Sequence, residues 1–211
     1  IVTYTVLDSA GNVSVPSNPM TLYIDYTAPN NPEEPILNSY SDLGESNADK
    51  LTNQDRVDIT LTNILPGYSG LIYLDDGVTK TKIDSGFYTP GTEGITFDVP
   101  TALTGTYIYT TVHVDTAGNR SGFSDPITIS VDRDAPSADV TYEGDALVRA
   151  GDISTLVTFT FSEPMDSVNV PTIDVLYPDP TGNVRLSGVA LVESGNGDDI
   201  WTFSIPLDGD D

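Results

Sequence analysis

The residues best suited to chemistry in this sequence are acidic side chains beside turns and short linkers. Asp115 and Asn119 belong to the run Asp-Thr-Ala-Gly-Asn, and we expect the linker that contains Asp25 to enter the same end of a domain. Carboxylate and amide oxygens are the ligands that Ca²⁺ takes, six to eight at a time. The three residues are therefore a candidate calcium site. The same run also serves as a plain hairpin turn, because Gly tolerates a positive φ and Asp and Asn bond nearby backbone amides.

A second acidic group contains more carboxylates. Asp132 and Asp134 occupy alternate positions of an extended linker, and Glu163 and Asp166 belong to a loop that we expect at the same end of the domain. Carboxylates gathered in this way repel one another unless a cation lies among them. The alternative is a solvated acidic rim whose charges salt screens over about 10 Å. No EF-hand spacing of Asp and Glu ligands is present, so spacing alone does not decide between the two.

Catalytic chemistry has few candidate groups in this chain. His113 is the single His, and the chain has no Cys and no glycine-rich phosphate loop. A lone His on a strand otherwise lined by Tyr and Thr is more typical of a packed, hydrogen-bonded side chain than of a catalyst. We therefore predict that the protein is not an enzyme.

The charge of the chain excludes one class of partner. The 211 residues include 8 Lys or Arg and 32 Asp or Glu, which gives a net charge of −24 at pH 7. Such a polyanion offers no cations to replace the counterions of nucleic-acid phosphates, so sequence-independent nucleic-acid binding is excluded. No apolar run approaches the ~20 residues that cross a bilayer, so we predict no membrane insertion.

An internal repeat organises the chain. The run Asp8-Ser-Ala-Gly-Asn12 recurs 107 positions later as Asp115-Thr-Ala-Gly-Asn119, and Asp25 and Pro29 recur in the same register as Asp132 and Pro136. A fixed period of this kind is the signature of a tandem array. The predicted domains are 1–26, the last two strands of a preceding unit; 27–135, a complete domain; and 136–211, a domain without its last two strands.

Short alternating runs, separated by turn residues about every ten positions, fill the complete unit. They predict strands near 36–40, 55–62, 70–75, 78–84, 94–99, 106–114 and 124–131, with Asp76-Gly77 as a hairpin turn. Seven strands in about 107 residues is the immunoglobulin-like count. We therefore predict an all-β protein of tandem immunoglobulin-like antiparallel β-sandwiches. In the strand 106–114, we expect the face that carries Tyr107 to be core, and Trp201 to be core rather than a sugar-stacking platform.

Several of these motifs carry a family resemblance. Asp-x-Ala-Gly-Asn-x-Ser after a strand, Asp-x-x-Ala-Pro at the linkers, and Phe161-Ser-Glu-Pro-Met165 resemble bacterial immunoglobulin-like repeats of large secreted surface adhesins. The resemblance implies a secreted or cell-surface spacer array that holds a binding module away from the cell and is stiffened by calcium between neighbouring domains. Thr27 stands where the second linker has Asp134, which weakens the case for an ion at the first linker.

Two further expectations concern partners. A carbohydrate- or protein-binding module is the alternative function, and it would use an exposed row of aromatic residues such as Tyr68, Tyr73, Phe87 and Tyr88. Residues 1–26 would supply the strands that 136–211 of a neighbouring copy lacks, by head-to-tail strand addition. The alternative is that the chain is a slice of a longer array, in which case the apparent fit follows from where the slice falls.

Overall fold

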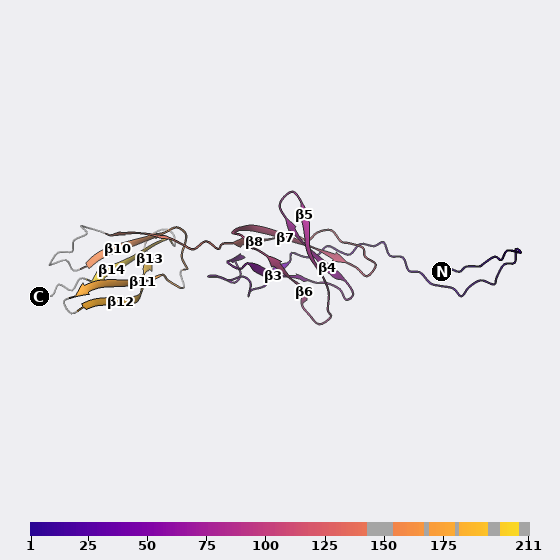
Figure 1. Cartoon of the computed structure of the whole chain (residues 1–211), viewed down its shortest axis with the longest axis horizontal. Helices are drawn as coiled ribbons and strands as arrows, with labels where there is room; N and C mark the ends of the chain where they lie inside the picture. The colour runs from indigo at the N-terminus through magenta and orange to yellow at the C-terminus, as the bar shows by residue number, and fades with distance from the viewer. Residues whose placement is uncertain (143–153, 167–168, 180–181, 194–198, 207–211) are drawn as a thin grey trace. The chain divides into compact units, whose positions relative to one another are not determined.

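The computed structural model describes residues 1–142, 154–166, 169–179, 182–193 and 199–206 (Figure 1). All regular elements in these residues are β-strands, which confirms the all-β prediction. No helix of the described residues is long and apolar enough to span a membrane. The described residues form two compact units, the first made of 1–38, 56–100 and 107–128, and the second of 39–55, 101–106 and 129–211. The predicted domain boundaries after residues 26 and 135 stay predictions.

Eight strands form two sheets in the region predicted as the complete domain. The three-stranded sheet has the order β1-β3-β6 and the five-stranded sheet the order β2-β8-β7-β4-β5. The strands are β1 (Ile36–Leu37), β2 (Leu51–Thr52), β3 (Arg56–Thr62), β4 (Ser69–Asp75), β5 (Lys80–Phe87), β6 (Gly94–Pro100), β7 (Gly105–Val114) and β8 (Ile127–Val131). Seven of them match the predicted strands. The sequence predicts no strand at β2, because two residues are too few to show an alternating pattern.

The core of the first unit follows from alternation on β3 and β6. Val57, Ile59 and Leu61 on β3 are buried, and their antiparallel partners on β6 are buried too. Gly70 on β4 lies so close to this layer that a Cβ there would meet Leu61 Cδ2 at 2.6 Å. The sheet of β4 and β7 therefore packs face to face on the sheet of β3 and β6, as in a β-sandwich.

Strand β7 is buried on both faces at its centre. Gly70 pairs with His113, so His113, Thr111 and Tyr109 lie on the inner face, which confirms the Tyr107 face as core. Thr110 and Val112 on the opposite face are also buried, so the strand is covered on both sides at this point. The reason is local: Tyr73, the β4 partner of Thr110, packs edge-on against Phe123 with ring centroids 5.1 Å apart.

The approach to β8 differs from the predicted strand 124–131. Before β8, two backbone N–H groups of β7 donate to serine hydroxyl oxygens rather than to backbone carbonyls. His113 N donates to Ser121 Oγ and Thr111 N to Ser124 Oγ, each over 3.0 Å. Regular strand begins only at Ile127, after a proline that has no N–H to give. The β4–β5 turn is where the sequence places it, with Asp76 N bonded to the Thr79 carbonyl.

The second unit contains two further sheets. The four-stranded sheet has the order β13-β14-β10-β9, and β11 pairs with β12 in a separate two-stranded sheet. The strands are β9 (Ala138–Tyr142), β10 (Ser154–Phe161), β11 (Thr172–Asp179), β12 (Gly182–Ala190), β13 (Val192–Glu193) and β14 (Ile200–Pro206). Trp201 is buried on β14, which confirms it as core. Parts of the predicted domain 136–211 lie outside the described residues.

Candidate functional site

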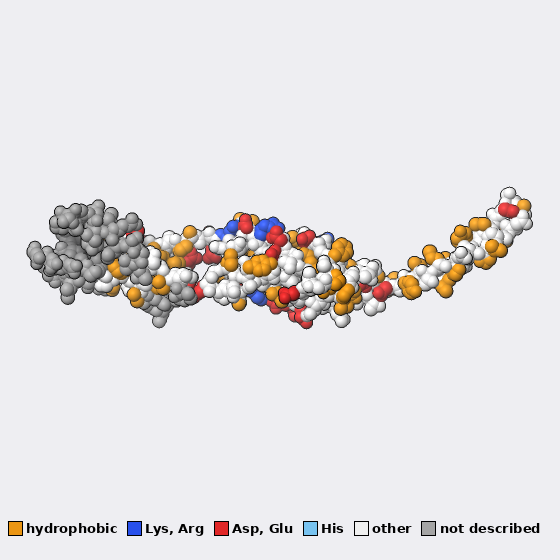
Figure 2. Space-filling view, turned by 90° about the horizontal axis from the view of Figure 1, so that it is seen from below, with side chains coloured by type: hydrophobic (Ala, Val, Ile, Leu, Met, Phe, Trp, Pro, Cys, Tyr) orange, Lys and Arg blue, Asp and Glu red, His pale blue; other side chains and the backbone are white. Residues whose placement is uncertain are grey.

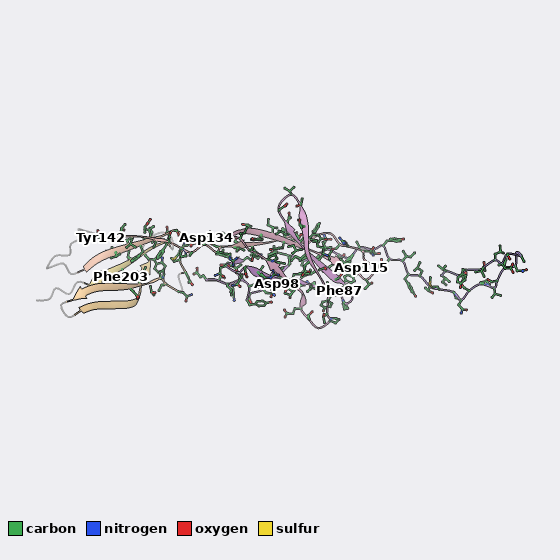
Figure 3. All side chains as sticks on the ribbon, viewed as in Figure 1. Phe87, Asp98, Asp115, Asp134, Tyr142 and Phe203 are labelled. Carbon is green, nitrogen blue, oxygen red and sulfur yellow. The ribbon has the colours of Figure 1, made fainter. Side chains whose placement is uncertain are left out.

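The turn after β7 is organised around one carboxylate. Asp115 Oδ1 accepts the backbone N–H groups of Ala117 and Asn119, each over 2.8 Å, and Oδ2 accepts Asn119 Nδ2 over 2.9 Å. These bonds, above all the one from the Asn119 side chain, hold the pKa of Asp115 below its ordinary 3.8. Gly118 supplies the positive φ of 91° that the turn requires. Asp115 (Figure 3) therefore fills its role as a turn residue with both oxygens engaged.

The same turn is bonded to the first linker. Asn119 Nδ2 donates to the backbone carbonyl of Asp25 over 3.1 Å. The Asp25 carboxylate instead accepts the backbone N–H of Thr27 over 2.8 Å. The structure thus brings Asn119 to Asp25, as the sequence predicts, but through a side-chain amide and the backbone rather than through carboxylates.

His113 fixes a second point of the same linker. Its Nδ1 lies 3.2 Å from the Asn30 carbonyl oxygen, and its ring packs edge-on against Tyr68 with centroids 6.4 Å apart. The side chain is buried, and burial lowers the pKa of His113 below its ordinary 6.5, an effect that the backbones of Asn30 and Thr62 partly offset. The prediction of a packed, hydrogen-bonded His is confirmed.

The second linker is bonded to neighbouring loops along its length. Asp132 N donates to the Thr52 carbonyl over 3.0 Å, and Arg133 donates from its backbone to Thr104 Oγ1 and from Nη1 to the Ala102 carbonyl. Asp134 N donates to Asp132 Oδ1 over 3.0 Å, which repeats the bond from Thr27 to Asp25 in the first linker. Both linkers therefore have the same local turn and a set of bonds to folded elements.

Three of the predicted acidic ligands lie within electrostatic reach of one another. The pKa of Glu163 is raised above its ordinary 4.5, first by partial burial and then by the charges of Asp132 and Asp134. Asp166 is engaged by its own loop, where Oδ1 accepts Asn169 N and Oδ2 accepts Asn169 Nδ2. In the described part of the chain, no three His, Cys, Asp or Glu side chains are arranged to hold a metal ion. The calcium site stays a prediction.

Asp42 is a buried carboxylate that the sequence does not predict. Asp42 is 2% exposed, and its Oδ2 accepts the backbone N–H of Lys50 over 3.0 Å. Its Oδ1 is buried without a hydrogen-bond partner among the described residues. Burial raises the pKa of Asp42 above its ordinary 3.8, and the adjacent Asp49 carboxylate adds to this effect. The sequence does not predict the burial of Asp42, because its segment is rich in polar residues, a composition typical of a solvent-exposed loop.

The four aromatic residues of the alternative binding function do not form one exposed row. Tyr68 packs on His113 and Tyr73 on Phe123, whereas Phe87 is 84% exposed at the end of β5 (Figure 3). Tyr88 is half-buried and donates weakly from its hydroxyl to the Thr92 carbonyl over 3.4 Å. A sugar-stacking surface needs exposed aromatic rings. The rings of Tyr68 and Tyr73 instead contact other rings of the protein.

Comparison with known proteins adds little to these observations. No protein-family profile matches the chain, and no curated protein matches it. Among solved structures, the chain is similar to the tetra-tandem repeat in the extending region of a large adhesion protein, with 16% identity over 97% of this chain and a TM-score of 0.28. The chain spans 55% of the length of that solved chain. A likeness at this TM-score carries no argument, so fold and function rest on the chain's own geometry.

Proposed function

We propose that this chain is a structural spacer, built from tandem immunoglobulin-like β-sandwiches and belonging to an extracellular adhesion protein. The observation that supports the proposal is that both linkers are hydrogen-bonded into folded elements. Residues 25–30 are held by Asn119 and His113, and residues 132–134 are held by the loops at Thr52 and at 102–104. A linker bonded in this way does not swing freely, which is what a spacer requires.

The first linker can be tested by double electron–electron resonance, because the chain has no cysteine to interfere with spin labelling. One label is placed at Ser9→Cys and the other at Val78→Cys, two exposed turn positions. We expect a narrow distance distribution in the parent chain and a broadened one in Asn119→Ala, which loses the bond to Asp25.

Asn12→Ala is the matched control for that experiment. Asn12 is the repeat equivalent of Asn119 and makes the same turn bond, Nδ2 to Asp8 Oδ2 over 2.8 Å. Its substitution changes a turn in the same way but leaves the bond between Asn119 and Asp25 intact, so the distribution should stay narrow. A broad distribution in the parent chain would overturn the proposal that the linker is held.

We further propose that Ca²⁺ binds at the second linker through Asp132, Asp134 and Glu163. The support is that the Glu163 carboxyl lies beside the Asp132 carboxylate and within electrostatic reach of Asp134, so that like charges face one another there and help to raise the pKa of Glu163. A divalent cation would relieve that repulsion and stabilise the folded state. The first linker, with Thr27 in place of Asp134, is expected to contribute less.

Calorimetric unfolding with Ca²⁺ and then with chelator tests this site separately from linker stiffness. An ion at 100 times its dissociation constant adds about 2.7 kcal/mol to the free energy of unfolding. Glu163→Gln should raise stability in chelator and reduce the calcium response, whereas Glu93→Gln at an exposed position of equal charge should leave the response unchanged. If chelator does not change the melting temperature, the three carboxylates form a solvated acidic rim and not a calcium site.

A further inference from the structure

Asp42 has one carboxylate oxygen that is buried and unsatisfied. The side chain is 2% exposed; Oδ2 accepts the Lys50 N–H over 3.0 Å, whereas Oδ1 has no hydrogen-bond partner among the described residues. Acidic side chains elsewhere reach the surface, where water solvates them, as the red side chains in Figure 2 show. Asp115, which is also buried, has both oxygens hydrogen-bonded. A buried carboxylate oxygen without a partner destabilises the fold, so Asp42 Oδ1 needs an electropositive partner.

The neighbour of the Asp42 carboxylate is a second carboxylate rather than a donor. Asp49 lies beside Asp42, and its charge acts on that side chain. Asp49 Oδ1 accepts the Leu51 N–H over 3.0 Å, and the same N–H acts on the Asp42 carboxylate. The two carboxylates therefore converge on consecutive amides of one turn, at which Lys50 has a positive φ of 63°. These amides donate to Asp42 Oδ2 and Asp49 Oδ1 and leave Asp42 Oδ1 unpaired beside a like charge.

A shared proton or a cation can relieve this arrangement. The hydrogen bonds from the Lys50 and Leu51 amides favour the ionised form of both carboxylates, because an N–H stabilises a negative oxygen. Asp49 is also exposed, so water stabilises its charge. Both effects favour two ionised carboxylates at neutral pH, and a hard cation with oxygen ligands is the partner that such a pair takes.

We propose that Asp42 and Asp49 together bind a divalent cation, Ca²⁺, with backbone carbonyls and water completing its six to eight oxygen ligands. The site has two carboxylates and not three, in agreement with the lack of a three-residue metal cluster in the part of the chain that the structure describes. It shares no ligand with the calcium site proposed at the second linker, so each site can exist without the other.

A cation at this position would hold the short strand β2 in place. β2 has two residues, and both pair in parallel with the end of β8. The Ser130 N–H donates to the Lys50 carbonyl over 2.9 Å, and the Asp132 N–H donates to the Thr52 carbonyl over 3.0 Å. The cation would therefore support the point at which the second linker begins. This consequence rests on the proposed spacer function, whereas the cation site itself does not.

Isothermal titration calorimetry with CaCl₂ at pH 7 tests the site. The measurement uses the Glu163→Gln chain, in which the second-linker site is expected to be weakened. We expect a binding event whose dissociation constant rises about tenfold or more in Asp42→Asn and in Asp49→Asn. Asp49 is exposed, so its substitution should not disturb the fold. Asp125→Asn removes the same charge at another exposed position and should leave the dissociation constant unchanged.

Two results of the titration would overturn the proposal. The first is no binding at about 10 mM Ca²⁺, ten times the weakest dissociation constants typical of extracellular calcium modules. A carboxyl pair that shares a proton would give this result. The second is a dissociation constant that stays unchanged in Asp42→Asn or in Asp49→Asn.

Hydrogen exchange in the same Glu163→Gln chain locates the cation. Ca²⁺ should slow exchange of the Lys50 and Leu51 amides, which donate to the two carboxylates, and of the Ser130 amide, which donates to the Lys50 carbonyl. Ca²⁺ should not change the exchange of these amides in Asp42→Asn. Protection elsewhere in the chain without protection of Lys50 and Leu51 would place the ion at a different site and overturn the proposal.

Discussion

Asn119 bonds through one side-chain amide to both the Asp115 carboxylate and the Asp25 carbonyl, over 2.9 and 3.1 Å. It therefore joins the turn after β7 to a linker 94 positions earlier in the chain. Asn12, the equivalent residue in the N-terminal segment, bonds to Asp8 of its own turn. At Asn119 the motif thus acts both as a turn and as a clamp on the linker.

Loss of this double contact should destabilise the fold. Asn119→Ala removes two hydrogen bonds and leaves the Asp25 carbonyl without the amide donor, so we expect a loss of about 1–2 kcal/mol in the free energy of unfolding. Asn12→Ala, which removes one exposed bond, should cost less. Denaturant unfolding followed by circular dichroism measures both. Equal effects of the two substitutions would show that the linker bond contributes nothing.

Stability should decrease on acidification below about pH 6.5 because of His113. Burial lowers the pKa of His113 in the folded state, so the unfolded chain takes up the proton first and gains stability relative to the fold. The contribution is fully present above pH 6.5 and is lost as the pH falls through the lowered pKa. His113→Gln, which can still donate to Asn30, should remove this slope below about pH 6.5. An unchanged slope would assign the pH dependence to other groups.

Replacement of a buried carboxylate should stabilise the protein at neutral pH. The raised pKa of Asp42 means that the folded state favours its protonated form, so stability falls as the pH rises above about 3.8. An Asn at this position can still accept a hydrogen bond from the Lys50 N–H, and its amide can donate to the Asp49 carboxylate. We therefore expect Asp42→Asn to raise the free energy of unfolding by about 1 kcal/mol at pH 7. The gain should shrink toward pH 4. A loss of stability at pH 7 would show that the charge is compensated.

Close packing between the two sheets predicts a steric effect at Gly70. A Cβ at this position would lie 2.6 Å from Leu61 Cδ2, with Ile95 and Phe97 close behind, so Gly70→Ala forces core side chains to shift. We expect a loss of about 1–3 kcal/mol, typical of an overpacked core. Ser69→Ala, the preceding residue of β4, is the control and should change the melting temperature little. An unchanged free energy of unfolding in Gly70→Ala would mean that the two sheets can move apart at this point without loss of stability.

Local spacing in the sequence determined which segments become strands and where the chain turns. Alternation of side chains marks β3, β4, β6 and β7, and the Asp and Gly of the repeated turn mark its ends, because both signals act over a few neighbouring residues. The 107-residue register likewise predicted that 1–26 resembles β7 and β8, and the hydrogen bonds of the two copies agree.

Tertiary structure alone decided what those segments contact. His113 is 6% exposed because the sheet of β3 and β6 packs over its face of β7, a contact that its place in an alternating strand does not reveal. The parallel pairing of β2 with β8, the burial of Asp42 and the bond from Asn119 to Asp25 depend on residues distant in the chain. No periodicity or short motif encodes such contacts, since they arise only when the sheets pack and bring remote backbone groups together.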